Sequence, residues 1–274
     1  GKEASGGAAT TATVASMERR LGRERIRRMP FEEAARRGRL RVVDMMPAYL
    51  NGIRRFVDLA AIRRAPFRVV VDAMHGAAGR AIEQMLHGGR CRVQTLRADP
   101  DPRFGGEAPE PIASHLGGLC RIVRQQRADV GIATDGDADR LGIIGPGGVW
   151  LNPGQVMCVL LEHLINVRGM RGAVVKTVSN TMMIDRMTAS MGLRLREVPV
   201  GFKHIVGLML KEDILIGGEE SGGIAIKGHI PERDGIWMGL TLWEFMAKSG
   251  KSLEELIKEV YTITGSFAFE RNDL

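Results

Sequence analysis

Short apolar segments alternate with segments of helical character along most of the 274-residue chain, and this alternation restricts the fold more than any other feature of the sequence. Residues 66–74 are rich in β-branched side chains and run into the small-residue turn HGAAGR. A helix is predicted at 81–86 and a strand at 92–96, so the local order is strand, turn, helix, strand. This order is typical of a layered α/β domain.

The same alternation continues through the rest of the chain. Further strands are predicted at 128–133, 140–144, 173–178, 193–198 and 213–216, and further helices at 112–126, 155–167, 181–190, from Phe202 onward and at 236–248. A glycine- and proline-containing break at 145–153 separates two groups of elements, each of ordinary domain size. The predicted fold class is therefore α/β, with mixed sheets in two consecutive layered domains at 46–148 and 149–274.

The two ends of the chain follow different patterns. Helices are predicted at 9–21 and 31–37 without any strand, so residues 1–45 are interpreted as the helical tail of a domain whose strands lie upstream. Another helix is predicted through Tyr49 and Val57. Residues 266–274 have the character of a strand that begins a link to a further domain.

A cluster of carboxylates follows one of the predicted strands, in VGIATDGDADRLGII. Asp135, Asp137 and Asp139 occupy alternate positions on a tight loop, and three such charges would repel each other severely without a cation. Hard oxygen ligands favour magnesium or calcium over zinc. An EF-hand loop would need glycine and glutamate where this chain has Arg140 and Pro146. A phosphate is a natural further partner for the metal beside Arg140, and three solvated loop aspartates remain the alternative.

A second polar loop lies in ILIGGEESGGIAIKGHIPERDG. A predicted strand ends in Gly217 and Gly218, and the loop then presents Glu219 and Ser221. Glycines allow the backbone to approach a ligand closely. A carboxylate beside a hydroxyl suits sugar hydroxyl groups, although many glycine-rich loops only connect two elements.

The net charge of +7 is compatible with nucleic acid or with a small anionic substrate. Ten arginines lie between residues 19 and 41, but aromatic residues make up only 5% of the chain and none alternate with these arginines. A base-stacking surface needs such aromatic side chains. We therefore interpret this segment as a solvated helix face and expect no nucleic-acid partner.

Composition also bears on the compartment. The three cysteines, Cys91, Cys120 and Cys158, are too widely spaced for a disulfide framework or a CxxC metal site. No apolar run approaches the roughly 18 residues of a membrane helix, and the start of the chain has no apolar core of a signal peptide. A cytoplasmic protein without a membrane association is expected.

The motifs DGDADR, GEESGG and HIPERDG, in this order and spacing, resemble the alpha-D-phosphohexomutase family, which includes phosphoglucomutases, phosphomannomutases and phosphoglucosamine mutases. DAMHGAAGR, FGGEAPEPI, VKTVSNTMMID and EVPVGFKHI are similar to further segments of that family. The resemblance implies an isomerase with four domains around a cleft. A phosphoserine of the first domain exchanges its phosphoryl group with a hexose phosphate, through a hexose 1,6-bisphosphate that also acts as activator.

The resemblance also implies the roles of individual residues. Magnesium would be held by Asp135, Asp137 and Asp139, with Arg140 steadying the phosphoryl group. Substrate contacts would come from Gly201, Lys203, Glu219, Ser221 and Arg233, and less strongly from Lys176. Val200 stands where the family often has threonine. The predicted partner is a hexose phosphate, and the protein is expected to be a monomer or a homodimer.

Two features of the family do not occur in these 274 residues. One is the Ser-His-Asn-Pro loop that carries the nucleophile, and the other is the phosphate-clamping loop of the fourth domain. A fragment spanning the end of domain 1, domain 2 and domain 3 is therefore expected, and it should be inactive alone. The loop with Glu220 and Gly223 resembles that of the glucose-specific branch of the family, which implies glucose phosphates as substrates. The alternatives are a mutase for mannose or glucosamine phosphate, or a non-catalytic module that binds sugar phosphate or metal.

Overall fold

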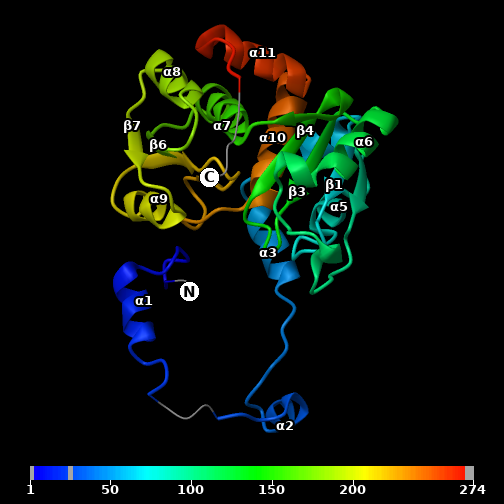
Figure 1. Ribbon diagram of the computed structural model, residues 1–274. Helices are drawn as coiled ribbons and strands as arrows, with labels where there is room; N and C mark the ends of the chain where they lie inside the picture. Colours follow the sequence, from blue (N-terminus) through cyan, green and yellow to red (C-terminus); the bar gives the residue numbers. More distant parts are fainter. Residues whose placement is uncertain (1–2, 24–26, 269–274) are drawn as a thin grey trace.

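The computed structural model describes residues 3–23 and 27–268, which contain two mixed β-sheets (Figure 1). The first sheet has the order β2-β1-β3-β4-β5, and the second has the order β7-β6-β8-β9. The strands are β1 (Arg68–Asp72), β2 (Arg92–Leu96), β3 (Val130–Thr134), β4 (Leu141–Gly145), β5 (Val149–Leu151), β6 (Ala173–Thr177), β7 (Leu195–Val198), β8 (Ile214–Gly218) and β9 (Ile224–Ile226).

Both sheets are built on the same plan. The central strands β1 and β6 each pair in parallel with two neighbours. Antiparallel strands are then added at one side, β4 and β5 in the first sheet and β9 in the second. The mixed α/β fold predicted from the sequence is confirmed.

Helices cover both faces of the first sheet because its buried strands carry apolar side chains on both sides. Val69 and Val71 point into one core, whereas Val70 points into another with Leu119 and Val123 of α6. The helices of this part of the chain are α3 (Met46–Ile53), α4 (Leu59–Arg64), α5 (Ala81–Leu86) and α6 (Gly117–Gln126), with short 3-10 turns at Phe104–Gly106, Ala113–His115 and Pro146–Gly148.

The second sheet is also covered on two sides. Val174 belongs to a large core with α7 and α8, and Val175 packs against Ile205 and Val206 of α9. The helices here are α7 (Pro153–Glu162), α8 (Met183–Ser190), α9 (Phe202–Met209), α10 (Gly235–Ser249) and α11 (Leu253–Thr264), with a π-helical turn at His163–Val167. Capping boxes at Asn152 and Ser252 fix the starts of α7 and α11.

Helix α10 joins the two sheets. It lies between them in Figure 1 and is buried along most of its length. Its residues Ile236, Trp237 and Leu240 belong to one apolar core that also contains side chains of β3 and β8. The two sheets are therefore held together by a shared core, and the loops at their facing edges are held near each other.

The amino-terminal residues add no strand to either sheet in the part of the chain that the structure describes. Helices α1 (Thr11–Glu18) and α2 (Phe31–Arg36) bury none of their residues and lie apart from the sheets (Figure 1). Gly7 and Ala9 are exceptions within this segment, since both are buried. None of the described helices is both long and apolar enough to cross a membrane.

Most predicted elements lie where the sequence pattern placed them, and the differences have local causes. The helix predicted through Tyr49 and Val57 ends at Ile53, and α4, which was not predicted, follows because Asp58 caps it through the amide of Ala61. The helix predicted at 112–126 starts as a 3-10 turn and becomes α-helical at Gly117. Strands β5 and β9 and helix α11 were not predicted. Residues 266–268 form no strand, and 269–274 lie outside the described residues.

Candidate metal and sugar-phosphate site

The aspartate loop connects the antiparallel strands β3 and β4. Ala138 adopts a positive φ of 65°, and this turn directs successive carboxylates of the loop to one side. Backbone hydrogen bonds from other segments fix the loop. The amide of Gly235 donates to the carbonyl of Ala138 at 3.0 Å, and the amide of Ala77 donates to the carbonyl of Gly136 at 2.9 Å. The start of α10 and the turn after β1 therefore both fix the loop.

The three predicted metal ligands converge. One carboxylate oxygen of each of Asp135, Asp137 and Asp139 lies within 4.8 Å of the others. Asp135 is buried, Asp139 is half-buried and Asp137 is exposed, so the cluster opens to solvent at one side. Three carboxylates on a fixed loop, with an open side for water or phosphate, fit a magnesium ion better than a softer metal.

The pKa of Asp139 is raised by its burial and, to a smaller extent, by the neighbouring carboxylates. Burial is the main cause that raises this pKa to about 7, the guanidinium of Arg233 opposes the rise, and the charges of Asp135 and Asp137 add to it. A cation at the cluster would favour the charged carboxylate. The carboxylates of the aspartate loop therefore favour the binding of a cation.

Arg140 supports the loop from within. Its amide donates to Asp135 Oδ1 at 3.0 Å, and its Nε donates to Asp135 Oδ2 at 2.7 Å. A weaker ion pair joins its guanidinium to Glu110 at 3.9 Å. The guanidinium is therefore placed beside the aspartate cluster, and its predicted action on a phosphoryl group stays a prediction.

The second loop connects β8 and β9 and buries its first carboxylate. Glu219 Oε1 accepts a hydrogen bond from the amide of Gly201 at 3.1 Å, and Oε2 lies 3.4 Å from a guanidinium nitrogen of Arg233. Burial raises the pKa of Glu219, and Arg233 opposes this rise. Ser221 follows on the same loop and is half-buried. Gly201, Glu219 and Arg233, which were predicted as substrate residues, are thus brought together.

The two loops are joined directly. The amide of Leu141 donates to the carbonyl of Gly222 at 3.1 Å, and Arg140 and Gly223 form an antiparallel bridge. Gly222 has φ of +91°, and a Cβ there would lie 2.3 Å from the carbonyl oxygen of Leu141. Glycine is required for this approach. The aspartate loop of the first sheet and the sugar loop of the second therefore form one site.

Two predicted lysines have different surroundings. Lys203 is exposed on α9, one turn or less from Gly201. Lys176 is only 2% exposed, and its ammonium contacts Asp185 at 2.6 Å and Glu197 at 3.3 Å. The charge of Lys176 is therefore buried and already paired within residues 149–274, and its contact with a substrate stays a prediction.

Sequence reasoning used Glu220 only for the choice of sugar and missed the contacts through which this residue fixes the sugar loop. Glu220 Oε2 accepts hydrogen bonds from Ser179 Oγ at 2.6 Å and Thr177 Oγ1 at 3.0 Å, both at the end of β6. The sequence offered a signal, since Thr177 and Ser179 end a strand parallel to the one that precedes Glu220. Carboxyl ends of parallel strands meet at one edge of a sheet.

A hollow of about 460 Å³ opens beside the aspartate loop, lined among others by Met45, Tyr49, Asp137, Asp139, His229 and Arg233. Asp234 also lines this hollow, and it accepts hydrogen bonds from the Tyr49 hydroxyl at 2.8 Å and from the amide of Trp237 at 2.8 Å. Carboxylates, an imidazole and a guanidinium give this hollow the polar groups that an anionic ligand with a cation would need.

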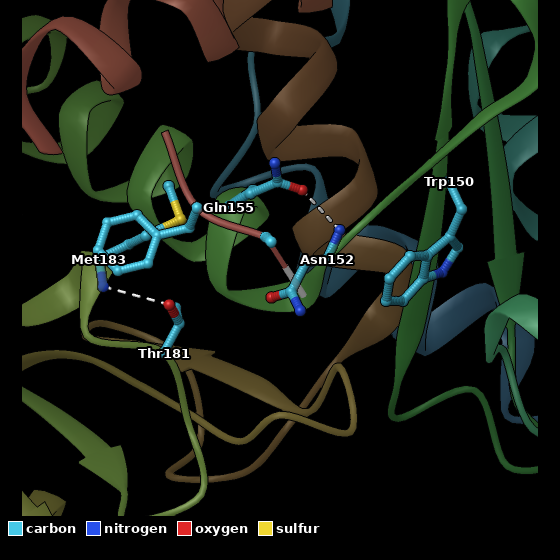
Figure 2. A pocket seen from close by; sticks show the side chains of 7 residues that line it. Trp150, Asn152, Gln155, Thr181 and Met183 are labelled. Carbon is cyan, nitrogen blue, oxygen red and sulfur yellow. Dashed lines mark hydrogen bonds between the residues drawn. The ribbon is translucent and has the colours of Figure 1, made fainter. Parts of the chain in front are cut away.

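A smaller hollow of about 210 Å³ lies where the chain leaves the first sheet (Figure 2). Figure 2 shows Trp150 on one side and Thr181 and Met183 on the other, with Asn152 and Gln155 between them. The amide of Asn152 donates to Gln155 Oε1 at 2.7 Å, which closes the first turn of α7. None of the predicted site residues lines this hollow, so we assign it to the connection between the sheets.

Comparison with known proteins agrees with this arrangement. Residues 47–148 match the family model described as phosphoglucomutase/phosphomannomutase, alpha/beta/alpha domain II, and residues 152–263 match domain III of the same family. The chain is 33% identical to the phosphoglucomutase/phosphomannomutase of Thermococcus kodakarensis over 81% of its own length and 49% of the relative. It is 28% identical to human phosphoglucomutase-1 over 85% of its length and 43% of the relative.

A solved structure shows the same fold. A protein of Thermus thermophilus, provisionally assigned as a phosphomannomutase, superimposes with a TM-score of 0.77 and 39% identity, over 81% of this chain and 52% of that one. The chain thus spans about half the length of the relatives it matches. With two consecutive domains of the same family matched in order, the chain belongs to the phosphoglucomutase/phosphomannomutase family.

Proposed function

We propose that the protein to which this chain belongs is a phosphohexomutase that interconverts hexose 1-phosphate and hexose 6-phosphate, most readily those of glucose. One observation carries the proposal. The aspartate loop and the sugar loop share Arg233, whose guanidinium lies 2.5 Å from Asp139 and 3.4 Å from Glu219. A metal-dependent phosphoryl transfer to or from a sugar needs both loops at one place.

The residues present fit a magnesium ion held by Asp135, Asp137 and Asp139. When bound, it would neutralise charge on the phosphoryl group being transferred. Arg140 keeps Asp135 oriented through two hydrogen bonds, so the cluster keeps its shape while the ligand changes. The phosphoserine nucleophile would come from outside these 274 residues, and a hexose 1,6-bisphosphate would be both intermediate and activator.

The sugar would be held from the opposite side. Glu219 is fixed by the amide of Gly201 on one oxygen and by Arg233 on the other, and each oxygen keeps a further lone pair that could accept from a sugar hydroxyl. Ser221 can donate or accept beside it. Lys203, exposed on the same helix end as Gly201, would be a further substrate contact. The preference for glucose rests on the similarity of the GEES sequence to glucose-specific relatives.

Binding to this chain tests the proposal without depending on residues outside it. Glucose 1-phosphate should bind in isothermal titration calorimetry when Mg²⁺ is present, and Asp137→Ala should abolish the effect of Mg²⁺. Lys227→Gln is the control, because Lys227 is an exposed cation within residues 149–274 and is paired with Asp213. Magnesium-independent binding, or unchanged magnesium binding in Asp137→Ala, would refute the metal assignment.

Activity then separates an enzyme from a binding module. The full-length parent protein should convert glucose 1-phosphate to glucose 6-phosphate in the presence of catalytic glucose 1,6-bisphosphate, whereas this chain alone should not. Ligand binding without turnover by the full-length protein would instead favour a non-catalytic sugar-phosphate module.

A further inference from the structure

Arg233 is the one side chain that contacts the key carboxylates of both loops within the described residues. One guanidinium nitrogen lies 2.5 Å from Asp139 Oδ2, and the other lies 3.4 Å from Glu219 Oε2. The side chain is 24% exposed, whereas those of Asp139 and Glu219 are 14% and 7% exposed. The ion pair with Asp139 is therefore half-buried and weakly screened, unlike a surface pair.

The surroundings hold Arg233 in this position. Its guanidinium lies over the ring of Phe202, with its carbon 5.0 Å from the ring centroid. On the other side Gly223 leaves room for the stem, because a Cβ there would lie 2.3 Å from Arg233 Cδ. The amide of Arg233 donates to Glu232 Oε1 at 3.1 Å, which fixes the backbone as well. The contact with Asp139 is thus built into the fold rather than made by a freely moving side chain.

This position has a consequence for ligand binding. The carboxylate of Asp139 has a close positive charge at Arg233, and a metal ion at the aspartate cluster would need the same carboxylate. A guanidinium engaged with Asp139 is also less available to a phosphate, since each pair would require its donors. The metal and the anionic substrate therefore both compete with one internal ion pair.

We propose that Arg233 is an internal counter-ion that couples the two ligands. Without a metal its guanidinium neutralises Asp139. With a metal on the aspartate cluster it is freed to bind the phosphate of the sugar substrate, so that Mg²⁺ and sugar phosphate bind cooperatively. This inference rests on the proposed function, and it adds that the two sites share one cation.

Calorimetric titration of the chain with MgCl₂, with and without saturating glucose 1-phosphate, measures this coupling. Arg233→Gln should bind Mg²⁺ alone more tightly than the native chain, by roughly fivefold or more, since the competing pair is gone. Glucose 1-phosphate should tighten Mg²⁺ binding in the native chain, and this factor should fall several-fold in Arg233→Gln. The exposed-cation control Lys227→Gln should behave like the native chain.

The variant Gly223→Ala distinguishes the effect of the Arg233–Asp139 contact from the effect of the Arg233 charge. Its added methyl group must displace the Arg233 stem but leaves the positive charge in the protein. If the contact matters, Gly223→Ala binds Mg²⁺ as tightly as Arg233→Gln does. If Gly223→Ala binds Mg²⁺ with native affinity while Arg233→Gln binds it more tightly, general repulsion between the Arg233 charge and Mg²⁺ explains the difference and the proposal is wrong.

Two further outcomes are decisive. Unchanged Mg²⁺ affinity in Arg233→Gln overturns the competition, even if glucose 1-phosphate binds normally and the proposed function stands. Absence of glucose 1-phosphate binding in the native chain defeats the proposed function, while the titrations with Mg²⁺ alone still decide the competition. Should Gly223→Ala fail to fold by circular dichroism, Arg233→Lys replaces it, because the donors of an ammonium all lie on one nitrogen, whereas two guanidinium nitrogens face Asp139 and Glu219. Arg233→Lys, which keeps the charge, should then bind Mg²⁺ more tightly than the native chain, and an unchanged affinity would overturn the proposal.

Discussion

Glu219 is the most strongly constrained residue of the sugar loop. One of its oxygens accepts from the amide of Gly201, and the other faces Arg233, so its position does not depend on a ligand. A buried carboxylate in a fixed position favours binding of a substrate whose hydroxyls pair with it. A substrate without matching hydroxyls would leave buried polar groups unpaired, at a cost of about 1–3 kcal/mol each. Selectivity among hexose phosphates should therefore depend on Glu219 more than on exposed charges.

Glu219→Ala in the full-length parent enzyme should lower kcat/KM for glucose 1-phosphate by roughly ten- to a hundredfold, since about 1.4 kcal/mol corresponds to a factor of ten. The matched comparison is a double variant, Arg27→Gln with Arg28→Gln, on the arginine-rich segment. Exposed charges are screened and contribute weakly, so this variant should stay within about twofold of the native enzyme. Greater damage in the arginine variant would show that the basic segment has a function of its own.

At the scale of elements, the segment before α1 packs against α9 and against the loop that precedes Arg233. Gly7 packs against α9, where a Cβ would lie 2.6 Å from Val206 Cγ1 and 3.3 Å from the carbonyl oxygen of Pro231. Gly6 lies against Ile230. The segment before α1 therefore lies on the loop that leads into Arg233, and it helps to hold that loop in place.

Gly7→Val should disturb this packing without backbone strain, because the φ of Gly7 is not positive. Hydrogen exchange followed by mass spectrometry should show faster exchange in residues 203–207 and 230–233. Gly207→Val is the matched control, since it lies on α9 but faces open space. Equal exchange in the two variants would mean that the segment does not support the loop.

Sequence patterns predicted the elements better than the contacts between them. The strands other than β5 and β9 were predicted, because buried β-branched runs such as 68–72 and 173–177 are typical of strands in a layered sheet. Strand β5 was missed because it has three residues and follows a glycine-rich turn. The three aspartates could be recognised as a cluster because they are neighbours in sequence. The pairs Arg233–Asp139 and Lys176–Asp185 could not, since only the folded chain brings these residues together.

At the scale of the whole molecule, one buried carboxylate links elements from both halves. Glu244 of the central helix α10 accepts hydrogen bonds from the amide of Asp58 at 3.0 Å, from Arg168 at 2.5 Å and from Lys248 at 2.9 Å. His163 Nε2 lies 3.5 Å from Glu244 Oε1, the oxygen that also accepts from Lys248. Asp58 caps α4 beside the first sheet, and His163 and Arg168 follow α7 beside the second, so this network should set how stability depends on pH.

The directions of the two pKa shifts give the sign of that dependence. Burial raises the pKa of Glu244, but hydrogen bonds from His163, Asp58 and Lys248 and the charge of Arg168 outweigh it and hold the pKa far below its ordinary value. Its stabilisation is therefore present above the unfolded-state pKa of about 4.3 and is lost as the pH falls below it. Burial lowers the pKa of His163, so the unfolded chain gains this proton first, below about pH 6.5.

We therefore expect the free energy of unfolding, measured by urea denaturation, to fall in two steps as the pH is lowered from about 8 to about 2. The first step, below about pH 6.5, should be smaller in His163→Asn by a slope of up to about 1.4 kcal/mol per pH unit, the value for one proton. The second step, below about pH 4.3, should be reduced in Glu244→Gln, which is also less stable at every pH because Arg168 and Lys248 lose a buried charged partner. His87→Asn is the control, since His87 is an exposed histidine at the end of α5. If His163→Asn and His87→Asn have the same slope between about pH 5 and about pH 7, His163 is not buried in its neutral form, and the network does not determine the acid sensitivity of the shared core.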